Sequence, residues 1–522
     1  MGLIGTRFDY PLAKHIYYNT MEIIANGIKF YLMGGKAYVM NNHYHGDVII
    51  PSHIPDNNGG VIPVAGIDIR AFCNCADLTS VVLPEGLQSI AAFAFMGCTS
   101  LRSIVIPDSV THIDACAFEY CNQLERVVLP KGLTYLPERC FCCCEALSDI
   151  VLPDTLELVG EYALHLTAWM KQQPEGIVYA GDILYGHRWD TYSERTLQVK
   201  DDTRVIGEGA MEGNQTLTHL ILPSSVRQIG ANAFRECKHL KTVELAEGLE
   251  VIGENAFEHC EDLEAVYIPA SVRYIGAEAF AHCKRLREIV VAADNPYLDS
   301  RGDCNAVIDS RKNKLIVGCS TTVIPDDVEV IGDYAMVGVY AAEEWVIPRN
   351  IKCVGYYAFA ENMSLRRLVV HDRMELISGW AFFSCENLQE IVLPDNYIEF
   401  GEQAFGDTNL SDSTTSGAVC VGNHLHAYYA QDEGEKVQEC IIPEGIEAID
   451  DKAFDFEPNG LRIFLPKSLR YVSNAAFIPS EAEYELIVPE GVGEDYPYYD
   501  IDNPQYAPDI YSKWMDILDD EG

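Results

Sequence analysis

A run of cysteines offers the side chains best suited to chemistry. Its members are Cys140, Cys142, Cys143 and Cys144. Thiolates grouped in this way are typical ligands of tetrahedral Zn²⁺. Cys144, however, also ends a series in which cysteine recurs every 23 residues, formed by Cys75, Cys98, Cys121 and Cys144. Cysteine at a repeat position is typically a small buried apolar side chain, so we predict reduced thiols and no metal site.

Other residues that could act on a substrate lack the partners that catalysis requires. The sequence has no glycine-rich phosphate loop, zinc-protease helix or nucleophile elbow. Histidines such as His219, His239 and His259 have no carboxylate and nucleophile at a fixed spacing beside them. We therefore predict no catalytic, cofactor-binding or metal-binding residues and no cofactor. An enzyme acting through a break in the sequence pattern is the least favoured alternative.

One short motif could bind a partner. Arg301-Gly302-Asp303 is the tripeptide that integrin ligands display, and it falls in a stretch that we expect to be exposed. Three-residue motifs are also frequent by chance, and chance is the favoured explanation here.

The charge of the chain limits the class of partner. There are 37 Lys and Arg residues against 79 Asp and Glu residues, a formal net charge of -42. Phosphate binding requires clustered basic residues, so we expect neither nucleic acid nor an anionic membrane as the partner. We expect an unidentified protein or a macromolecule on a host or cell surface. The alternative is that the acidity serves solubility alone.

Membrane and targeting segments are not predicted. No stretch approaches the roughly 20 continuous apolar residues of a spanning helix. Before Ile23 the sequence lacks the basic, apolar and small-residue segments of a secretion signal. As written, the chain is therefore expected in the cytoplasm. A start further upstream would instead place it at the cell surface or outside the cell.

The elements that position these residues follow a period of 23. One unit, residues 101–123, reads LRSIVIPDSVTHIDACAFEYCNQ. Ile104 and Ile106 alternate with polar or outward residues, which predicts a strand with one buried face that Pro107 ends. The apolar positions from Val110 to Phe118 recur at spacings of three and four, which favours turns or short helical fragments. Each unit is therefore one coil.

A single coil cannot fold alone. Burying about six large apolar side chains yields roughly 9 to 18 kcal/mol, whereas ordering the backbone costs roughly 1 to 2 kcal/mol per residue. Stacking lets neighbouring coils cover each other and pair parallel strands about 4.8 Å apart. The repeat therefore predicts a solenoid.

The unit resembles the BspA-like leucine-rich repeat of bacteria. The pattern Leu-x-x-Ile-x-Ile-Pro-x-x-Val-x-x-Ile-x-x-x-Ala-Phe-x-x-Cys is clearest at residues 101–121, 240–260 and 263–283. The resemblance implies a right-handed, mostly β solenoid with a parallel sheet on one face and turns or helical fragments on the other. It also implies a role in adhesion or protein interaction.

The period is broken at several places, which gives the predicted organisation. An N-terminal extension covers 1–20 and a hairpin cap 21–62. Repeat arrays cover 63–153, 211–291, 325–405 and 441–480. Interruptions cover 154–210, 292–324 and 406–440, the first two with a β-hairpin. Residues 481–522 hold a last strand and an acidic tail, which either caps the last coil or forms a mobile interaction tail.

The candidate binding surface is a column of outward, mostly apolar strand positions. Its members are Val82, Val105, Val128, Val151, Ile221, Tyr267, Val290, Val346, Val369 and Val392. Beside it runs a polar column that includes Ser103, Arg126 and Asp149. An apolar column could supply contact area and a polar one discrimination; the alternative is that β-branched residues merely favour strands. We predict a non-catalytic protein-binding scaffold of the adhesin kind, with a structural spacer that presents its acidic tail as the alternative.

Overall fold

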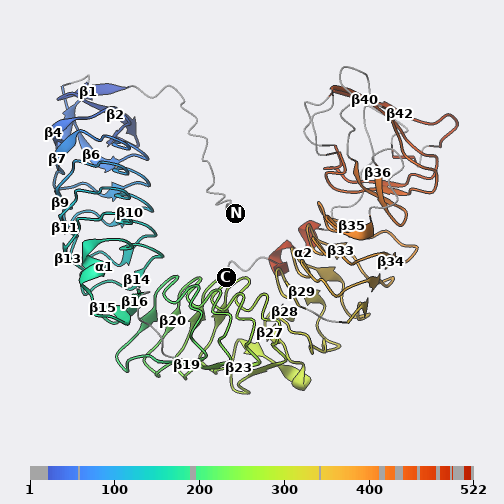
Figure 1. The fold of residues 1–522 in the computed structure, drawn as a ribbon. Coiled ribbons are helices and arrows are strands. Elements are labelled where there is room, and N and C mark those ends of the chain that lie inside the picture. Colours follow the sequence, from blue (N-terminus) through green and yellow to red (C-terminus); the bar gives the residue numbers. More distant parts are fainter. Residues whose placement is uncertain are drawn as a thin grey trace. The chain divides into compact units, whose positions relative to one another are not determined.

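The computed structural model describes residues 22–56, 59–188, 195–339, 342–410, 418–428, 439–454, 459–477, 483–493, 496–497 and 511–518. The chain divides into two compact units, unit 1 (Met1–Thr191) and unit 2 (Tyr192–Gly522). In each unit, successive coils stack and pair parallel strands (Figure 1). The predicted leucine-rich repeat solenoid is confirmed. The predicted extension at 1–20 lies outside the described residues.

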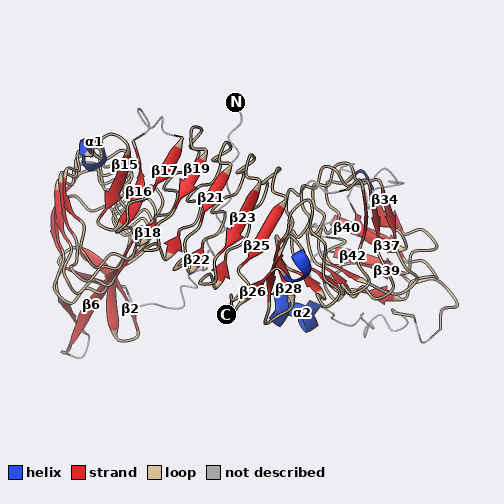
Figure 2. Ribbon diagram, turned by 90° about the horizontal axis from the view of Figure 1, so that it is seen from below, coloured by secondary structure: helices blue, strands red, loops and turns tan. Residues whose placement is uncertain are grey.

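A first row of parallel strands follows the predicted strand position of each coil. In unit 1 it comprises β4 (Gly46–Ile49), β7 (Leu78–Val82), β9 (Ser103–Val105), β11 (Arg126–Val128) and β13 (Asp149–Val151). In unit 2 it comprises β17 (Thr196–Gln198), β19 (His219–Ile221), β21 (Thr242–Glu244), β23 (Ala265–Ile268), β25 (Glu288–Val291), β30 (Glu344–Val346), β32 (Arg367–Val369), β34 (Glu390–Val392), β38 (Glu439–Ile441), β40 (Asn459–Phe464) and β42 (Glu483–Ile487). Figure 2 shows β19, β21, β23 and β25 side by side.

A second row of strands, most of them two residues long, was not predicted. In unit 1 it comprises β6 (Val61–Ile67), β8 (Ser89–Ile90), β10 (His112–Ile113), β12 (Tyr135–Leu136) and β14 (Leu158–Val159). In unit 2 it comprises β18 (Val205–Ile206), β20 (Gln228–Ile229), β22 (Val251–Ile252), β24 (Tyr274–Ile275), β29 (Val330–Ile331), β31 (Cys353–Val354), β33 (Leu376–Ile377), β35 (Glu399–Phe400), β39 (Ala448–Ile449) and β41 (Tyr471–Val472). Identical coil lengths bring these short extended segments into register, so their backbone groups pair between coils. The remainder of the return path consists of turns, as predicted.

Antiparallel hairpins begin new runs of the second row. The N-terminal strands β1 (Ile23–Ala25), β2 (Ile28–Met33) and β3 (Lys36–Val39) are antiparallel, and β3 continues in parallel to β6, which also pairs with β5 (His53–Pro55). Within the interruptions lie the hairpins β15 (Ile177–Ala180) with β16 (Ile183–His187), β27 (Val307–Asp309) with β28 (Lys314–Val317), and β36 (Ala418–Val421) with β37 (His424–Tyr428); β26 (Leu298–Asp299) pairs with β27. In unit 2, β28 continues to β29 and β37 to β39. The interruptions therefore repeat the architecture of the N-terminal cap.

Stacked phenylalanine rings form the centre of each array. In unit 1 the ring centroids are 4.8 Å apart for Phe72 and Phe95, 5.1 Å for Phe95 and Phe118, and 5.2 Å for Phe118 and Phe141. Unit 2 contains the stacks Phe234–Phe257–Phe280 and Phe359–Phe382–Phe405. Offset stacks of this kind stabilise a core beyond their area burial. The constant step of 23 residues therefore places aromatic rings in contact from coil to coil within each stack.

The repeated cysteines are buried hydrogen-bond donors. The thiol of Cys121 donates to the carbonyl oxygen of Phe95 at 3.2 Å, and the thiol of Cys144 donates to that of Phe118 at 3.1 Å. The same contact recurs in unit 2, where Cys260 donates to Phe234. Each of these carbonyl groups also accepts a backbone N–H of its own coil, so the thiol of the next coil supplies a second donor and links the two coils.

The C-terminal helix packs on the array. Helix α2 (Tyr511–Leu518) buries Trp514 and Leu518 against the outward side chains of β29, β31 and β33, namely Val330, Cys353 and Leu376. The Trp514 indole N–H donates to Glu375 at 3.2 Å, and Lys314 donates to the carbonyl oxygen of Leu518 at 3.0 Å. Both views place α2 beside β28 (Figures 1 and 2). This part of the tail therefore covers coils in the middle of unit 2 and does not cap the last one.

Other helical elements in the described residues are the five-residue α1 (Ala168–Gln172) and the 3-10 turn η1 (Arg301–Asp303). Among these residues, no helix is long and apolar enough to cross a membrane.

Candidate partner-binding face

The outward column of the first strand row is continuous in unit 1. Val105, Val128 and Val151 are direct register partners on β9, β11 and β13, and their side chains are 61%, 36% and 77% exposed. They point outward because successive side chains of a strand alternate between faces, and the intervening Ile104 and Val127 fill the core. Three large apolar side chains therefore lie next to each other in contact with solvent.

These valines are among the residues that line an open groove of about 530 Å³. Pro107 and Pro153 are among the residues that line it, as are the charged side chains of Arg126 and Asp149. Arg126 Nε lies 3.4 Å from Asp149 Oδ2. Exposed ion pairs of this kind contribute at most about 1 kcal/mol, so a partner could exchange them for its own charges at little cost. The lining of the groove thus combines apolar side chains with charged ones.

The face extends toward the N-terminus of unit 1. Val82 is 54% exposed, and its register partner on β4, Ile49, is 67% exposed. Strand β7 contacts β9, so both side chains extend the same column. Ile49 was missed because its strand precedes the 23-residue pattern. The signal was the sequence Val48-Ile49-Ile50-Pro51, which has the same strand ending as the repeats.

In unit 2 the predicted column is divided into shorter pieces. Tyr267 and Val290 are exposed register partners on β23 and β25, and Val346 is exposed on β30. Ile221, Val369 and Val392 are half-buried, and Glu244 faces outward beside Ile221. Ile441 occupies the equivalent position on β38 and is exposed. The structure therefore brings four of the ten predicted residues together in unit 1, and the other six form smaller groups in unit 2.

The companion polar column is more ordered than its sequence suggests. In unit 2, Arg367 lies between Glu344 at 2.6 Å and Glu390 at 3.1 Å. The hydrogen bond from Arg367 to Glu390 raises the pKa of the guanidinium. Arg462 lies in the same way between Glu439 and Glu485. The 23-residue register therefore places opposite charges on neighbouring strands beside the apolar column.

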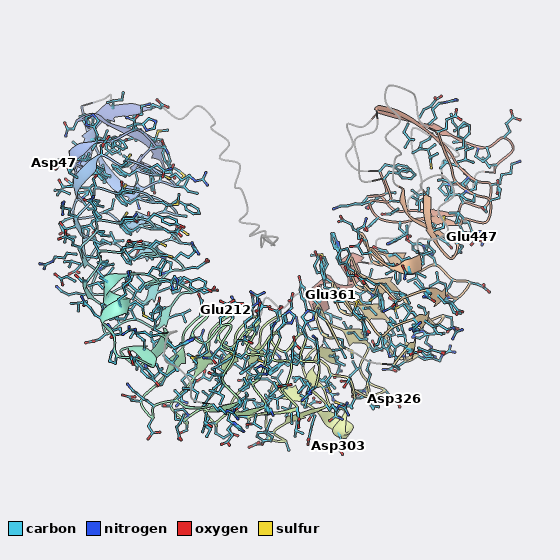
Figure 3. All side chains as sticks on the ribbon, in the orientation of Figure 1. Asp47, Glu212, Asp303, Asp326, Glu361 and Glu447 are labelled. Atoms are coloured by element: carbon cyan, nitrogen blue, oxygen red, sulfur yellow. The ribbon has the colours of Figure 1, made fainter. Side chains whose placement is uncertain are left out.

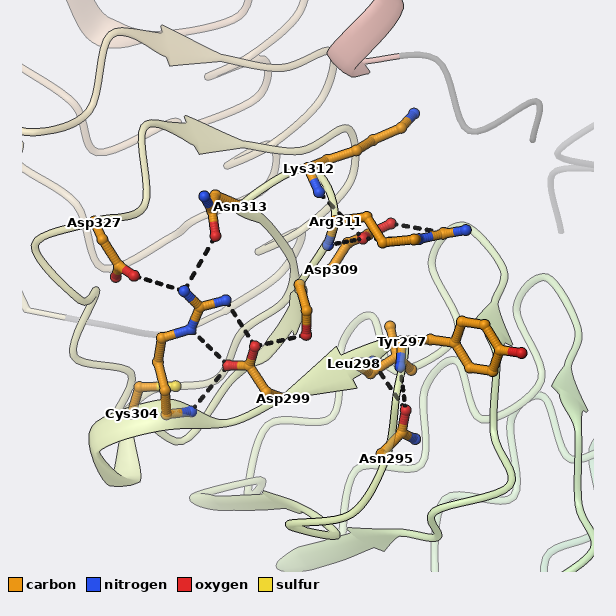
Figure 4. Close-up of polar contacts among 12 residues, drawn as sticks. Asn295, Tyr297, Leu298, Asp299, Cys304, Asp309, Arg311, Lys312, Asn313 and Asp327 are labelled. Atoms are coloured by element: carbon orange, nitrogen blue, oxygen red, sulfur yellow. Dashed lines mark hydrogen bonds and ion pairs between the residues drawn. The ribbon is translucent and has the colours of Figure 1, made fainter.

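The Arg301-Gly302-Asp303 tripeptide does not present its arginine freely, because the guanidinium is bound by three side chains that Figure 4 labels, Asp299, Asn313 and Asp327. The Arg301 guanidinium binds Asp299 Oδ2 and Asp327 Oδ2, each at 2.6 Å, and Asn313 Oδ1 at 3.1 Å. Its hydrogen bonds with Asp299 raise the pKa of the guanidinium. Asp303 is exposed. A receptor that binds both charges would have to break these contacts, so the motif is better explained as part of the fold.

The cysteine run is divided between different environments. Cys140 and Cys144 are fully buried, and the Cys144 thiol donates a hydrogen bond to the carbonyl group of Phe118. The sulfur atoms of Cys142 and Cys143 are 3.6 Å apart. Burial raises the pKa of the Cys142 thiol to about 12. A raised pKa disfavours the thiolate, which is the form that attacks electrophiles and binds metals.

A buried His–Asp–His cluster in unit 2 was missed by the sequence analysis. Asp450 Oδ1 accepts from His424 Nδ1 at 2.7 Å, and Asp450 Oδ2 accepts from His426 Nδ1 at 3.1 Å. Burial alone would raise the pKa of Asp450, but the two imidazoles hold it below its ordinary value. The His426 Nε2 atom accepts from the Phe405 amide. With all three side chains enclosed, the cluster stabilises the β36–β37 hairpin and is closed to a substrate.

Comparisons with known proteins agree with the repeat. A family model described as BspA type leucine rich repeat region (6 copies) matches residues 65–172, 190–301, 316–429 and 426–494. No curated protein matches the chain. Among solved structures, the pneumococcal vaccine antigen PcpA is 16% identical with a TM-score of 0.37, covering 90% of this chain and 99% of that one. A leucine rich cell surface protein from Faecalibacterium prausnitzii is 21% identical with a TM-score of 0.29, covering 91% and 96%. The family model covers well over half of the 522 residues.

Proposed function

Because this chain belongs to the BspA-type leucine-rich repeat family, we propose that it is a non-catalytic scaffold that recognises another protein through its first strand row. The observation that carries the proposal is the row of adjacent exposed valines, Val105, Val128 and Val151, that lines a groove. Contiguous exposed apolar side chains are costly in water and mark interaction sites.

The chemistry of the groove favours a protein segment with apolar side chains and flanking charges of both signs. The lining includes Arg126 and Lys131 as well as Asp108 and Asp149. The net charge of -42 favours a partner that is neutral or basic overall. Recognition of the adhesin kind is the form of this function that we favour.

The alternative function is a structural spacer that presents its acidic tail to a partner. The helical part of the tail gives this alternative less support. Trp514 and Leu518, two residues of the tail that this alternative presents to a partner, are already buried on unit 2. An enzyme acting through an interruption has no supporting arrangement of side chains among the described residues of the three hairpins.

The test uses peptides selected from a displayed library against the intact chain. The variant Val105→Thr/Val128→Thr/Val151→Thr keeps the branched strand-favouring shape but replaces apolar surface by hydroxyl groups. Affinity measured by calorimetry should fall about tenfold or more, since each lost apolar contact contributes roughly 1 kcal/mol. Unchanged affinity would contradict the placement of the site.

The matched control is Ile24→Thr/Met33→Thr/Val61→Thr. These three side chains are also exposed in unit 1, but they lie on β1, β2 and β6, outside the first strand row. This variant should bind the selected peptides as tightly as the wild type. An equal loss in both variants would indicate a general effect on folding or nonspecific adhesion to apolar surface.

A further inference from the structure

Two histidines one repeat apart form an unexplained cluster in unit 2. The rings of His259 and His282 stack on neighbouring coils with centroids 4.3 Å apart and planes within 8°. Glu258 Oε1 lies 3.5 Å from His259 Nε2. One ligand atom from each of these three residues lies within 4.8 Å of the other two. Glu258 and His282 are buried, and the His259 side chain is 33% exposed.

The coil that follows the interruption at 292–324 completes the cluster. The His282 amide donates to the carbonyl oxygen of Val337 at 3.4 Å, so the two coils are neighbours. A Cβ atom at Gly338 would lie 2.1 Å from His282 Nδ1, which shows that this glycine leaves the space that the imidazole occupies. Glu361 Oε2, one coil further, lies 3.9 Å from His282 Nε2. Side chains from both ends of the interruption therefore meet at one point.

This cluster is separate from the proposed partner-binding face. Figure 3 shows Glu361 on the same edge of unit 2 as Glu212, with Asp303 and Asp326 on the opposite edge. Strands β19 and β23 of the first row lie on the Asp303 side (Figure 1). An ion bound at the histidines would leave the first strand row open.

The electrostatic environment favours an added cation. Arg235 Nε binds Glu258 Oε2 at 2.6 Å and is shared with Glu212. Glu212, Glu258 and Glu361 carry three negative charges near the histidines, and Arg235 carries one positive charge, so negative charge is in excess.

We propose that Glu258, His259 and His282 form a binding site for one divalent transition-metal ion of the Zn²⁺ class. Glu361 supplies the fourth ligand. Two imidazoles with carboxylate oxygens are a common donor set for this class of ion.

Loading the site requires a local movement. Zinc–ligand distances of about 2.0 to 2.2 Å require ligand atoms closer together than in the cluster. The lone pairs of two parallel imidazoles cannot meet at one ion, so one ring must turn. His259 is the ring that turns, because it is partly exposed, whereas His282 is enclosed over Gly338. The bound ion then joins the coils on the two sides of the interruption.

The test is calorimetric titration of the intact, reduced chain with ZnCl₂. The wild type should bind one ion at the site with a Kd of about 1 µM or lower. His259→Ala should weaken this binding at least about tenfold, as loss of a ligand requires. The matched control is His239→Ala, an exposed histidine of the same unit that pairs with Asp262; it should leave binding unchanged. Zn²⁺ should raise the Tm of the wild type and not that of His259→Ala.

Cobalt distinguishes this site from the cysteines. Co²⁺ bound by nitrogen and oxygen should give visible tetrahedral bands without the sulfur-to-metal band in the near ultraviolet. Glu361→Gln, a substitution at a half-exposed side chain, should weaken binding while the fold is retained. Wild-type affinity in the millimolar range, full affinity in His259→Ala, or a sulfur band that accounts for all the bound Co²⁺ would each overturn the proposal.

Discussion

The phenylalanine stack of unit 1 predicts how much one coil contributes to its neighbours. Phe118 is fully buried, with ring centroids 5.1 Å from Phe95 and 5.2 Å from Phe141. Phe118→Ala should therefore cost about 3 to 5 kcal/mol in free energy of unfolding, the usual cost of removing a buried aromatic ring. Because coils depend on their neighbours, the loss should concentrate in the coils that contact residue 118.

The comparison with Phe141→Ala isolates the stacking contribution. Phe141 is also buried, but among the described residues its ring stacks on Phe118 alone. Phe141→Ala removes one stacking contact where Phe118→Ala removes two, so it should cost about 0.5 to 1.5 kcal/mol less.

Native-state hydrogen exchange measures both costs coil by coil, which avoids assuming two-state unfolding of a repeat array. Amides of β9 and β11 should lose the most protection in Phe118→Ala. A cost below about 1 kcal/mol, or a larger cost for Phe141→Ala, would refute the reasoning that stacked rings hold the coils together.

Three further predictions concern the cysteines, the buried carboxylate and the C-terminal helix. In the folded chain, iodoacetamide should modify the half-buried Cys143 well before Cys121, because burial raises the pKa of the Cys121 thiol. Mass spectrometry of digests measures the order of modification, and unfolding in urea should abolish the difference. Asp450→Asn should cost about 2 to 3 kcal/mol at neutral pH, where the carboxylate is hydrogen-bonded by two histidines. The pKa of Asp450 is lower in the folded than in the unfolded chain, so the carboxylate stabilises the fold fully above its unfolded pKa. This stabilisation is lost as the pH falls through the folded pKa. The free energies of unfolding of wild type and variant, measured by urea titration, should therefore converge in acid. Trp514→Ala should weaken the docking of α2 on unit 2 by about 3 kcal/mol, so the amides of α2 should exchange their hydrogens faster. Unchanged exchange rates of these amides would contradict the docking of the helix at this position.

Much of the fold is predictable because the coil length is constant. A step of 23 residues fixes Phe95, Phe118 and Phe141 at one position, and stacking then follows from burial. The second strand row was missed because strands such as His112–Ile113 are too short to show an alternating pattern. The spacing from Val110 to Ile113 fits a helical turn equally well. The segment forms a strand because its backbone pairs with the neighbouring coil, and this pairing depends on the register between coils.

The candidate sites depend more on contacts between distant residues. Val105, Val128 and Val151 could be predicted because alternation within each strand fixes their direction. Burial of Val369 depends on neighbouring side chains, which the period does not specify.

Elsewhere a sequence signal was present but incomplete. His259 and His282 are one period apart and were predictable neighbours, but Glu361 reaches them across an interruption of irregular length. The docking position of Trp514 could not be predicted from local spacing, since Glu375, its hydrogen-bond partner, lies 139 residues earlier.

The central proposal, recognition through the first strand row, is tested most directly by photo-cross-linking. A benzophenone side chain placed at Val128, which lines the groove, should cross-link to a bound library-selected peptide, and one placed at Val61 should not. Cross-links from position 61 with none from position 128 would contradict the account.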